Sequence, residues 1–216
     1  MARKPRIQPP LQDRSRATLE RILEAATALL ETQVWDDIAI SAIARRAQSS
    51  IGSFYARFAD KNALLDHLDE RYAAELTDLL EAHMKEARAA AWSLEERAGH
   101  LLQALITYHR TRRGLLRTLV LTARAGNSSR YRARSQRINA ALPVLVENFK
   151  QCGELHGPDL DARLHHALTF TFSALRDQLL FPESMPNPYS RTDAELAEAL
   201  SRNFLGYLAY KPESGR

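Results

Sequence analysis

Apolar residues recur three and four positions apart along almost the whole chain, and this period constrains the fold more than any other feature. The first example places Leu19, Ile22, Leu23, Ala26 and Leu30 on one face of a helix expected over residues 13–32. Such a stripe is typical of a helix that packs on one side. Alternating β-branched residues bounded by turn residues, the signal of a strand, are absent from the sequence. The period therefore predicts an all-α fold of about nine helices.

The remaining helices can be placed from their stripes and from start and stop signals. They are expected over residues 40–47, 50–58, 60–88, 93–113, 115–125, 129–152, 159–181 and 192–209. Asp60 and Asp159 are placed to cap two of them, and Ser93 and Thr192 each begin a capping box. Pro143 falls inside a predicted helix and should kink or split it.

Composition narrows the class of protein. A chain of 216 residues suits one long domain, or a small domain joined to a larger one. The single cysteine excludes an intramolecular disulfide, so we expect a cytoplasmic protein. No secretory signal and no apolar run long enough to span a membrane is present. The net charge of +4 is compatible with nucleic acid but does not establish it.

Motifs of catalysis are missing from the sequence. It contains no nucleophile elbow, no phosphate-binding loop and no metal-ligand spacing. His165 and His166 are adjacent, which is not a metal-binding spacing. We therefore expect neither an enzyme nor a metal site nor a cofactor.

The stretch QSSIGSFY, residues 48–55, separates two segments that both look helical. It combines small hydroxyl residues, one glycine and two adjacent aromatics. Ile22, Ile43, Phe54 and Phe58 can pack three short helices into one unit, whose second and third helices are joined by a tight turn. This is the layout of a helix-turn-helix, in which the last helix enters the major groove of DNA.

The polar and exposed positions around that last helix are the candidate DNA contacts. Small residues allow close approach to a duplex, Tyr55 can donate its hydroxyl to a phosphate, and Lys61 can add a charge at the next helix start. Ile51 suits a thymine methyl, and Arg57 suits a phosphate or a guanine edge. The predicted DNA-binding residues are Ser49, Ser50, Ile51, Gly52, Ser53, Tyr55, Arg57 and Lys61.

Residues 13–66 resemble the N-terminal domain of the TetR family of transcriptional regulators. The matching positions are Ile43, Ala44, Ala47, Ser50, Gly52, Tyr55, Phe58, Lys61 and Leu64, with Phe54 in place of leucine. Gln48 departs from the pattern where glycine is usual, at a cost of about 1 kcal/mol if the residue is left-handed. Ala39 departs where a threonine or serine often caps, which leaves Asp36, Asp37 or Ser41 for that role.

The resemblance implies a homodimeric repressor that binds a palindromic operator and is released by a small-molecule effector. The implied organisation is a basic tail over 1–12, a helix-turn-helix domain over 13–60, and a helical effector-binding and dimerisation domain over 61–212. The alternative is an effector-independent DNA-binding protein that is regulated by a protein partner. A larger domain with no internal cavity would favour that alternative.

Effector contacts can be placed only by helix. Tyr108, His109, Phe149 and Phe170 lie on the helices that surround the effector in the resembling family, although aromatics at helical spacing are also typical of a core. Nine arginines and no acid lie between Arg110 and Arg137. They can form a solvated face, extend the footprint on DNA, or place Arg117 or Arg124 in a pocket for an anion. The sequence leaves the role of this segment open.

The last two predicted helices, 159–181 and 192–209, carry apolar residues beyond their core stripes. Paired with their copies, they would form a four-helix bundle between two chains. The alternative is that both helices are ordinary core. A two-fold dimer implies a palindromic operator, because each half-site meets one recognition helix.

Overall fold

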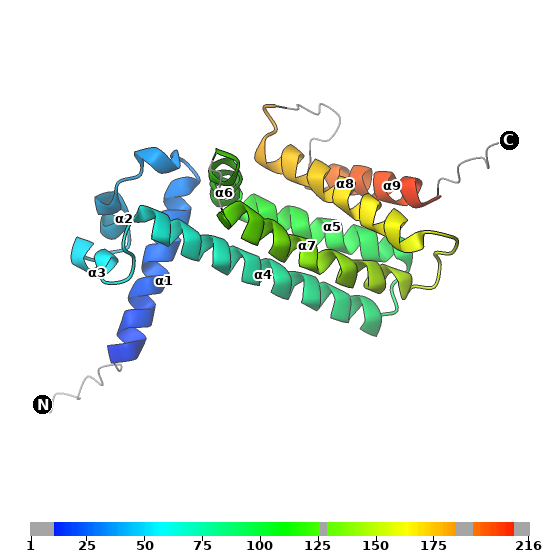
Figure 1. Ribbon diagram of the computed structural model, residues 1–216, viewed down its shortest axis with the longest axis horizontal. Helices are drawn as coiled ribbons and strands as arrows, with labels where there is room; N and C mark the ends of the chain where they lie inside the picture. Colours follow the sequence, from blue (N-terminus) through cyan, green and yellow to red (C-terminus); the bar gives the residue numbers. More distant parts are fainter. Residues whose placement is uncertain (1–10, 126–128, 185–191, 210–216) are drawn as a thin grey trace, which may run out of the picture. The chain divides into compact units, whose positions relative to one another are not determined.

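The computed structural model describes residues 11–125, 129–184 and 192–209 (Figure 1). These residues form nine α-helices and one short 3₁₀ helix, and no strand occurs among them. The all-α prediction is confirmed. Packing divides the chain into a first unit, Met1–Leu68, and a second, Asp69–Arg216. Residues 1–10 of the predicted basic tail lie outside the described residues.

The first unit contains three helices and the start of a fourth. In chain order they are α1 (Leu11–Leu30), the 3₁₀ helix η1 (Trp35–Asp37), α2 (Ile40–Arg46), α3 (Ile51–Tyr55) and the first turns of α4 (Lys61–Ala89). α2 packs against both α1 and α3. Ile22, Ile43, Phe54 and Phe58 are all buried, as the sequence predicts, and the rings of Phe54 and Phe58 lie 5.5 Å apart.

The second unit contains the rest of α4 and five further helices. They are α5 (Leu94–Thr111), α6 (Arg113–Ala125), α7 (Ser129–Lys150), α8 (Leu160–Leu180) and α9 (Asp193–Ala209). α5, α8 and α9 pack on one another, and α6 and α7 pack against α8 (Figure 1). Leu101, Ile106, Leu145, Leu164 and Phe204 are buried in their common core. None of the described helices is long and apolar enough to cross a bilayer.

Three of the predicted helix starts have the expected caps. Ser93 and Glu96 form the complete capping box of α5. Thr192 and Glu195 exchange the equivalent bonds before α9, at 2.8 and 3.2 Å. Asp60 Oδ1 accepts from the amide of Ala63 at 2.8 Å.

The expected cap at Asp159 is wrong, and so is the expected split of a helix at Pro143, whereas the kink expected there as the alternative stays a prediction. Asp159 precedes α8, but its backbone is left-handed (φ 54°) and its side chain makes no capping bond. A capping side chain normally needs an extended backbone to reach the first amides, so this conformation prevents the bond. Pro143 does not split α7, which continues through it. The flanking residues Leu142 and Leu145 are buried in the core, which holds the helix together across the proline.

Candidate functional site

The turn between α2 and α3 is closed by backbone bonds around Gln48. The amide of Ser49 donates to the carbonyl of Ala44 at 2.9 Å. Gln48 is left-handed, with φ 49°, as its place in the turn predicts. A side chain in this conformation carries a strain of about 1 kcal/mol relative to glycine. The turn therefore keeps its shape without the glycine usual in the resembling family.

Two of the predicted hydroxyl contacts are engaged in starting α3. Ser50 is its N-cap, and its Oγ accepts from the amide of Ser53 at 3.0 Å. The hydroxyls of Ser50 and Ser53 also bond each other at 2.9 Å. A five-residue helix needs such a cap because it has few internal bonds of its own. These hydroxyls fix the start of α3.

The outer face of α3 is apolar and exposed. Ile51 is 47% exposed and Tyr55 is 55% exposed, whereas Phe54 between them is fully buried. The Tyr55 ring meets the Phe54 ring edge-on, with centroids 5.5 Å apart. Gly52 lies on the exposed side, and a Cβ built there would meet only the Ser50 hydroxyl, at 3.7 Å. Internal packing therefore does not require glycine at this position.

Arg57 and Lys61 both bond within the first unit. The Arg57 guanidinium donates to the carbonyl of Ser53 at 2.7 Å and to the carbonyl and hydroxyl of Ser15 at 3.1 Å, which joins α3 to α1. Lys61 Nζ donates to the carbonyls of Trp35, Asp36 and Ile38 at 2.6, 3.2 and 3.0 Å. It also lies 4.9 Å from the centroid of the Trp35 ring. Arg57 thus stabilises the contact between α3 and α1, and Lys61 stabilises the turn between α1 and α2.

The second unit contains a pocket of about 200 Å³ that is partly open to solvent. Its wall is formed by side chains of α4, α5, α6, α7 and α8, most of them leucine, alanine, valine or phenylalanine. Its polar lining residues are Tyr72 and Thr77 on α4, His109 on α5, Asn139 on α7, and Thr169, Ser173 and Arg176 on α8. An apolar pocket with a few polar groups is the usual form of a small-molecule site.

The predicted effector residues are spread over several places, and only His109 lines this pocket. Phe149 is buried in the core against Phe204, with ring centroids 5.1 Å apart. Phe170 is 56% exposed on α8, and its ring meets the ring of Tyr207 on α9 edge-on. Tyr108 does not line the pocket but lines a groove between α4 and α5.

Arg117 also lies outside the pocket lining. Its guanidinium pairs with Glu183, donates to the carbonyl of Leu180 at 3.0 Å and lies 5.1 Å from the centroid of the Phe181 ring. Other arginines of the segment pair with acids as well: Arg110 with Asp193, Arg112 with Glu75, and Arg113 with Glu183. Arg124 is exposed, and the side chains of Arg130, Arg132, Arg134 and Arg137 lie outside the described residues. The arginines up to Arg117 thus have structural partners.

Sequence reasoning missed the polar residues of α8. Thr169, Ser173 and Arg176 are spaced four and three apart, so they share one face of the helix. The Thr169 hydroxyl is buried and has no hydrogen-bond partner in the described residues. A row of polar residues beside the apolar stripe of a core helix was the signal that could have identified them.

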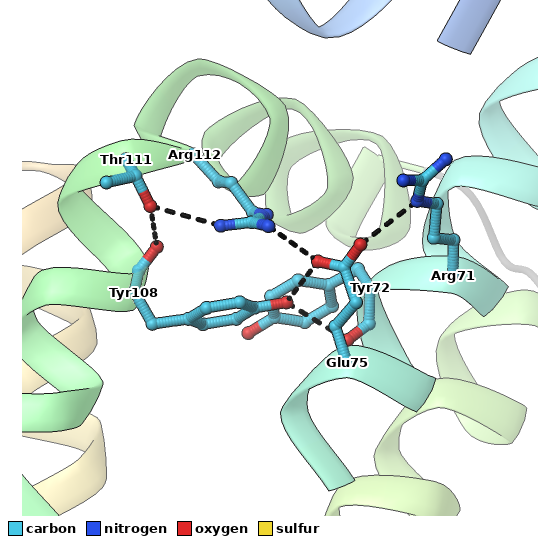
Figure 2. Close-up of polar contacts among 6 residues, drawn as sticks. All are labelled: Arg71, Tyr72, Glu75, Tyr108, Thr111 and Arg112. Atoms are coloured by element: carbon cyan, nitrogen blue, oxygen red, sulfur yellow. Dashed lines mark hydrogen bonds and ion pairs between the residues drawn. The ribbon is translucent and has the colours of Figure 1, made fainter. Parts of the chain in front are cut away.

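A polar network anchors the pocket wall formed by α4 (Figure 2). The Glu75 carboxylate accepts from Arg71 at 3.0 Å and Arg112 at 2.8 Å, and from the Tyr108 hydroxyl at 3.2 Å. Burial acts to raise the pKa of Glu75, but the bond from Arg71, the charge of Arg112 and the bond from Tyr108 hold the pKa below its ordinary value. Burial and the Glu75 charge raise the pKa of Tyr108. The network therefore keeps the carboxylate ionised and the phenol protonated.

Residues 22–68 match a family model described as bacterial regulatory proteins of the tetR family. No curated protein matches the chain. Among solved structures, a regulator attributed to the TetR family from Mesorhizobium loti MAFF303099 is 21% identical, with a TM-score of 0.71 over 91% of this chain and 97% of that one.

Two regulators with bound ligands have the same fold. FadR from Bacillus subtilis, in complex with stearoyl-CoA, is 15% identical, with a TM-score of 0.65 over 88% of this chain and 97% of that one. FadR from Thermus thermophilus, a TetR-family repressor in complex with lauroyl-CoA, is 19% identical, with a TM-score of 0.59 over 92% and 98%.

The chain has the fold of these regulators, and its first unit has the layout of a helix-turn-helix. The match to the family model concerns this first unit. Residues 22–68 form a DNA-binding domain of the TetR family, in a chain with the fold of that family's regulators.

Proposed function

We propose that the protein is a repressor that occupies a palindromic operator and leaves it when a small effector enters the pocket of the second unit. The observation that carries this proposal is the outer face of α3. Ile51, Gly52 and Tyr55 are exposed there, side by side, on a helix that is capped and buried on its opposite face. A short helix with a small, partly apolar outer face suits the major groove.

The predicted DNA contacts fall into two groups, because some of these side chains make no internal bond whereas others are already bonded within the first unit. Tyr55 and Ile51 can contact DNA without losing an internal bond, so we place them at its centre, with Ser49 and Gly52 beside them. Ser50 and Ser53 contribute by setting the start of α3. A phosphate contact by Arg57 or Lys61 has to compete with the bonds that each already makes.

The exposed ring pair on α8 and α9 supports a homodimer through these helices. Phe170 and Tyr207 lie with ring centroids 6.0 Å apart, and His166 stacks on Phe170 at 6.1 Å. Exposed aromatics that touch one another are typical of an interface that a partner covers. A second copy of the chain is the proposed partner, because two-fold symmetry presents two α3 helices to a palindrome.

The pocket supports an effector-responsive regulator over one controlled by a protein partner, which would not require an internal cavity. An effector shifts DNA binding only if it has different affinities for the DNA-binding and released states of the dimer. The acyl-CoA complexes of the two FadR proteins show that this fold accepts small ligands elsewhere. For this chain we propose the same type of control by a ligand that fits its own pocket. No catalytic step is part of this function.

The first experiment is fluorescence anisotropy with a duplex from upstream of the protein's own gene and a shuffled duplex of equal length, at several salt concentrations. We expect tighter binding to the upstream duplex, and at least a tenfold loss of this preference in Tyr55→Ala. Val34→Ala, which also shortens an exposed side chain in the first unit, is the matched control and should bind as the wild type does. Equal affinity of Tyr55→Ala and wild type would contradict the placing of α3 on DNA. Equal, steeply salt-dependent binding to both duplexes would indicate backbone contacts alone.

A further inference from the structure

We propose that the effector is a small carboxylate with a compact apolar body, and that Arg176 on α8 binds its carboxylate. This inference rests on the effector role proposed for the pocket, and it specifies the chemistry of the ligand. Three properties of the pocket support this ligand: its charge, its unpartnered hydroxyl and its size.

The residues of the described chain that line the pocket carry positive charge and no negative charge. Arg176 is the single side chain with a permanent charge among the described residues that line it, and none of these residues is acidic. His109 lines the pocket from α5, with its Nδ1 bonded to the carbonyl of Leu105 at 2.7 Å. Arg176 lines the pocket while 37% of its side chain is exposed, so it offers a bound anion a positive charge at a partly solvated position.

Most of the Arg176 guanidinium remains available to a ligand. Its Nε donates to Asp177 Oδ1 at 3.2 Å, and no other described residue bonds its two terminal nitrogens. Both side chains of this neighbouring pair are more than a third exposed, so the pair is a weak one. The terminal nitrogens of arginine match the two oxygens of a carboxylate, which favours that anion over a single-oxygen group.

Thr169 supplies a second, independent indication of a polar ligand atom. Its hydroxyl is buried at the pocket, on the α8 face that carries Ser173 and Arg176, and it has no hydrogen-bond partner in the described residues. Threonine in a helix can bond the carbonyl one turn earlier, but Thr169 does not. A buried hydroxyl without a partner is unfavourable, so a ligand oxygen that bonds it would gain affinity.

Size limits the rest of the ligand. The pocket of about 200 Å³ is larger than an apolar cavity of about 150 Å³ that holds benzene. It is smaller than the pockets of roughly 300–1,000 Å³ that enclose drug-sized ligands. An acid of about eight carbon atoms suits this space, which lies between those two sizes. A nucleotide-bearing ligand such as an acyl-CoA does not.

The test uses isothermal titration of the full-length protein with octanoate and 3-phenylpropionate, each paired with its alcohol, octan-1-ol or 3-phenylpropan-1-ol. Octanoyl-CoA is the fifth probe. We expect at least one acid to bind at least tenfold more tightly than its alcohol and more tightly than octanoyl-CoA. If neither acid exceeds its alcohol, or if octanoyl-CoA binds best, the proposal is overturned.

Three variants assign the site. Arg176→Gln should weaken binding of the acid at least tenfold and leave binding of the alcohol unchanged. Thr169→Val, which preserves side-chain shape, should weaken the acid severalfold and gives a second readout if Arg176→Gln folds poorly. Arg88→Gln, which alters an exposed arginine on α4 outside the pocket, is the matched control. Wild-type affinity for the acid in both pocket variants would overturn the assignment.

A separate measurement distinguishes failure of this inference from failure of the proposed function. The acid that binds best is added to the complex of protein and upstream duplex, and release of DNA is followed by anisotropy. Release of DNA supports both proposals. Binding of the acid without release would sustain the ligand chemistry and contradict the effector role of the pocket.

Discussion

The hydroxyl of Tyr108 on α5 donates to the carboxylate of Glu75 on α4 at 3.2 Å, and the ring of Tyr108 stacks on that of Tyr72 at 5.5 Å. Tyr72 lines the pocket, so the α4 wall of the pocket rests on this contact with α5. Arg112 lies 4.6 Å from the centroid of the Tyr108 ring and pairs with the same carboxylate. One acid thus holds two helices together beside the pocket.

Removing the charge of Glu75 should destabilise the second unit. We expect Glu75→Gln to lower the free energy of unfolding by about 1–3 kcal/mol, because it weakens charged hydrogen bonds to two arginines. Tyr108→Phe should cost about 1 kcal/mol, since it removes one hydroxyl. In urea denaturation, the double variant should lose less free energy of unfolding than the sum of the two single losses. The reason is that both substitutions act on the bond between Tyr108 and Glu75. Simple additivity would show that the bond contributes nothing.

Lowering the pH should titrate two groups with lowered pKa values in different pH ranges, and the first of these groups is the buried His83. Burial lowers the pKa of His83 from 6.5 to about 4, with the charges of His100 and Arg97 acting in the same direction. The unfolded chain binds this proton as pH falls through 6.5, but the folded chain does not until about pH 4. The contribution of His83 to the free energy of unfolding is therefore fully present above pH 6.5. It is lost progressively as the pH falls toward 4, by up to about 3 kcal/mol. His83→Leu should flatten this loss in urea midpoints measured from pH 8 to 4.5.

The control for that experiment is His156→Gln, which alters an exposed histidine and should follow the wild-type curve. The Glu75 pKa lies below its ordinary value of 4.5, so its contribution is present above pH 4.5 and is lost only as pH falls further. A wild-type midpoint that stays constant between pH 6.5 and 4.5 would contradict the His83 assignment.

Gly52→Ala should separate DNA binding from stability. The added Cβ meets the Ser50 hydroxyl at 3.7 Å, an ordinary contact, and alanine favours a helix more than glycine does by up to about 1 kcal/mol. We expect the thermal midpoint to be unchanged or raised, and operator affinity to fall at least tenfold because the methyl group projects from the outer face of α3. Retention of operator affinity would remove Gly52 from the DNA contact.

Ala39→Thr should stabilise the first unit. Ala39 is the N-cap of α2, with an extended backbone (φ −78°, ψ 146°), and no side chain caps this helix. The sequence leaves Asp36, Asp37 or Ser41 as substitutes, and the structure shows that none of them makes this bond. A hydroxyl at position 39 should raise the free energy of unfolding by about 1 kcal/mol. Ala39→Val places a side chain of the same shape but without an acceptor there, so it should not raise the free energy of unfolding. Equal stability of the two variants would exclude a capping effect.

The helical period was sufficient to predict the fold because each helix buries one stripe. The helix starts at Asp60, Ser93 and Thr192 were predictable since a capping bond joins residues three apart in sequence. Asp159 was not, because its backbone conformation depends on the loop before it. The sequence therefore predicted the helix starts that are fixed by bonds between residues close in sequence.

The site was less predictable because its polar groups bond over long distances in sequence. Nothing near Arg57 indicates that it bonds Ser15, forty-two residues earlier. The dense arginine segment drew attention to Arg117, which bonds Leu180 and Glu183, whereas Arg176 stands beside a single acid in sequence and lines the pocket. Which cation faces a cavity depends on how helices pack, and a single sequence does not encode that in any short pattern.

The bonds of Lys61 have a practical consequence for dissecting the protein. Its ammonium holds three carbonyls of the turn between α1 and α2, so that turn is completed by a residue more than twenty positions further along the chain. A fragment that ends at residue 60, where the sequence suggests a domain boundary, would keep every candidate base contact. It would lose the three hydrogen bonds from Lys61. A fragment that ends at Leu68 would retain these bonds, together with the buried Leu64 and Leu65. The smallest piece that keeps the first unit intact thus includes the first two turns of α4.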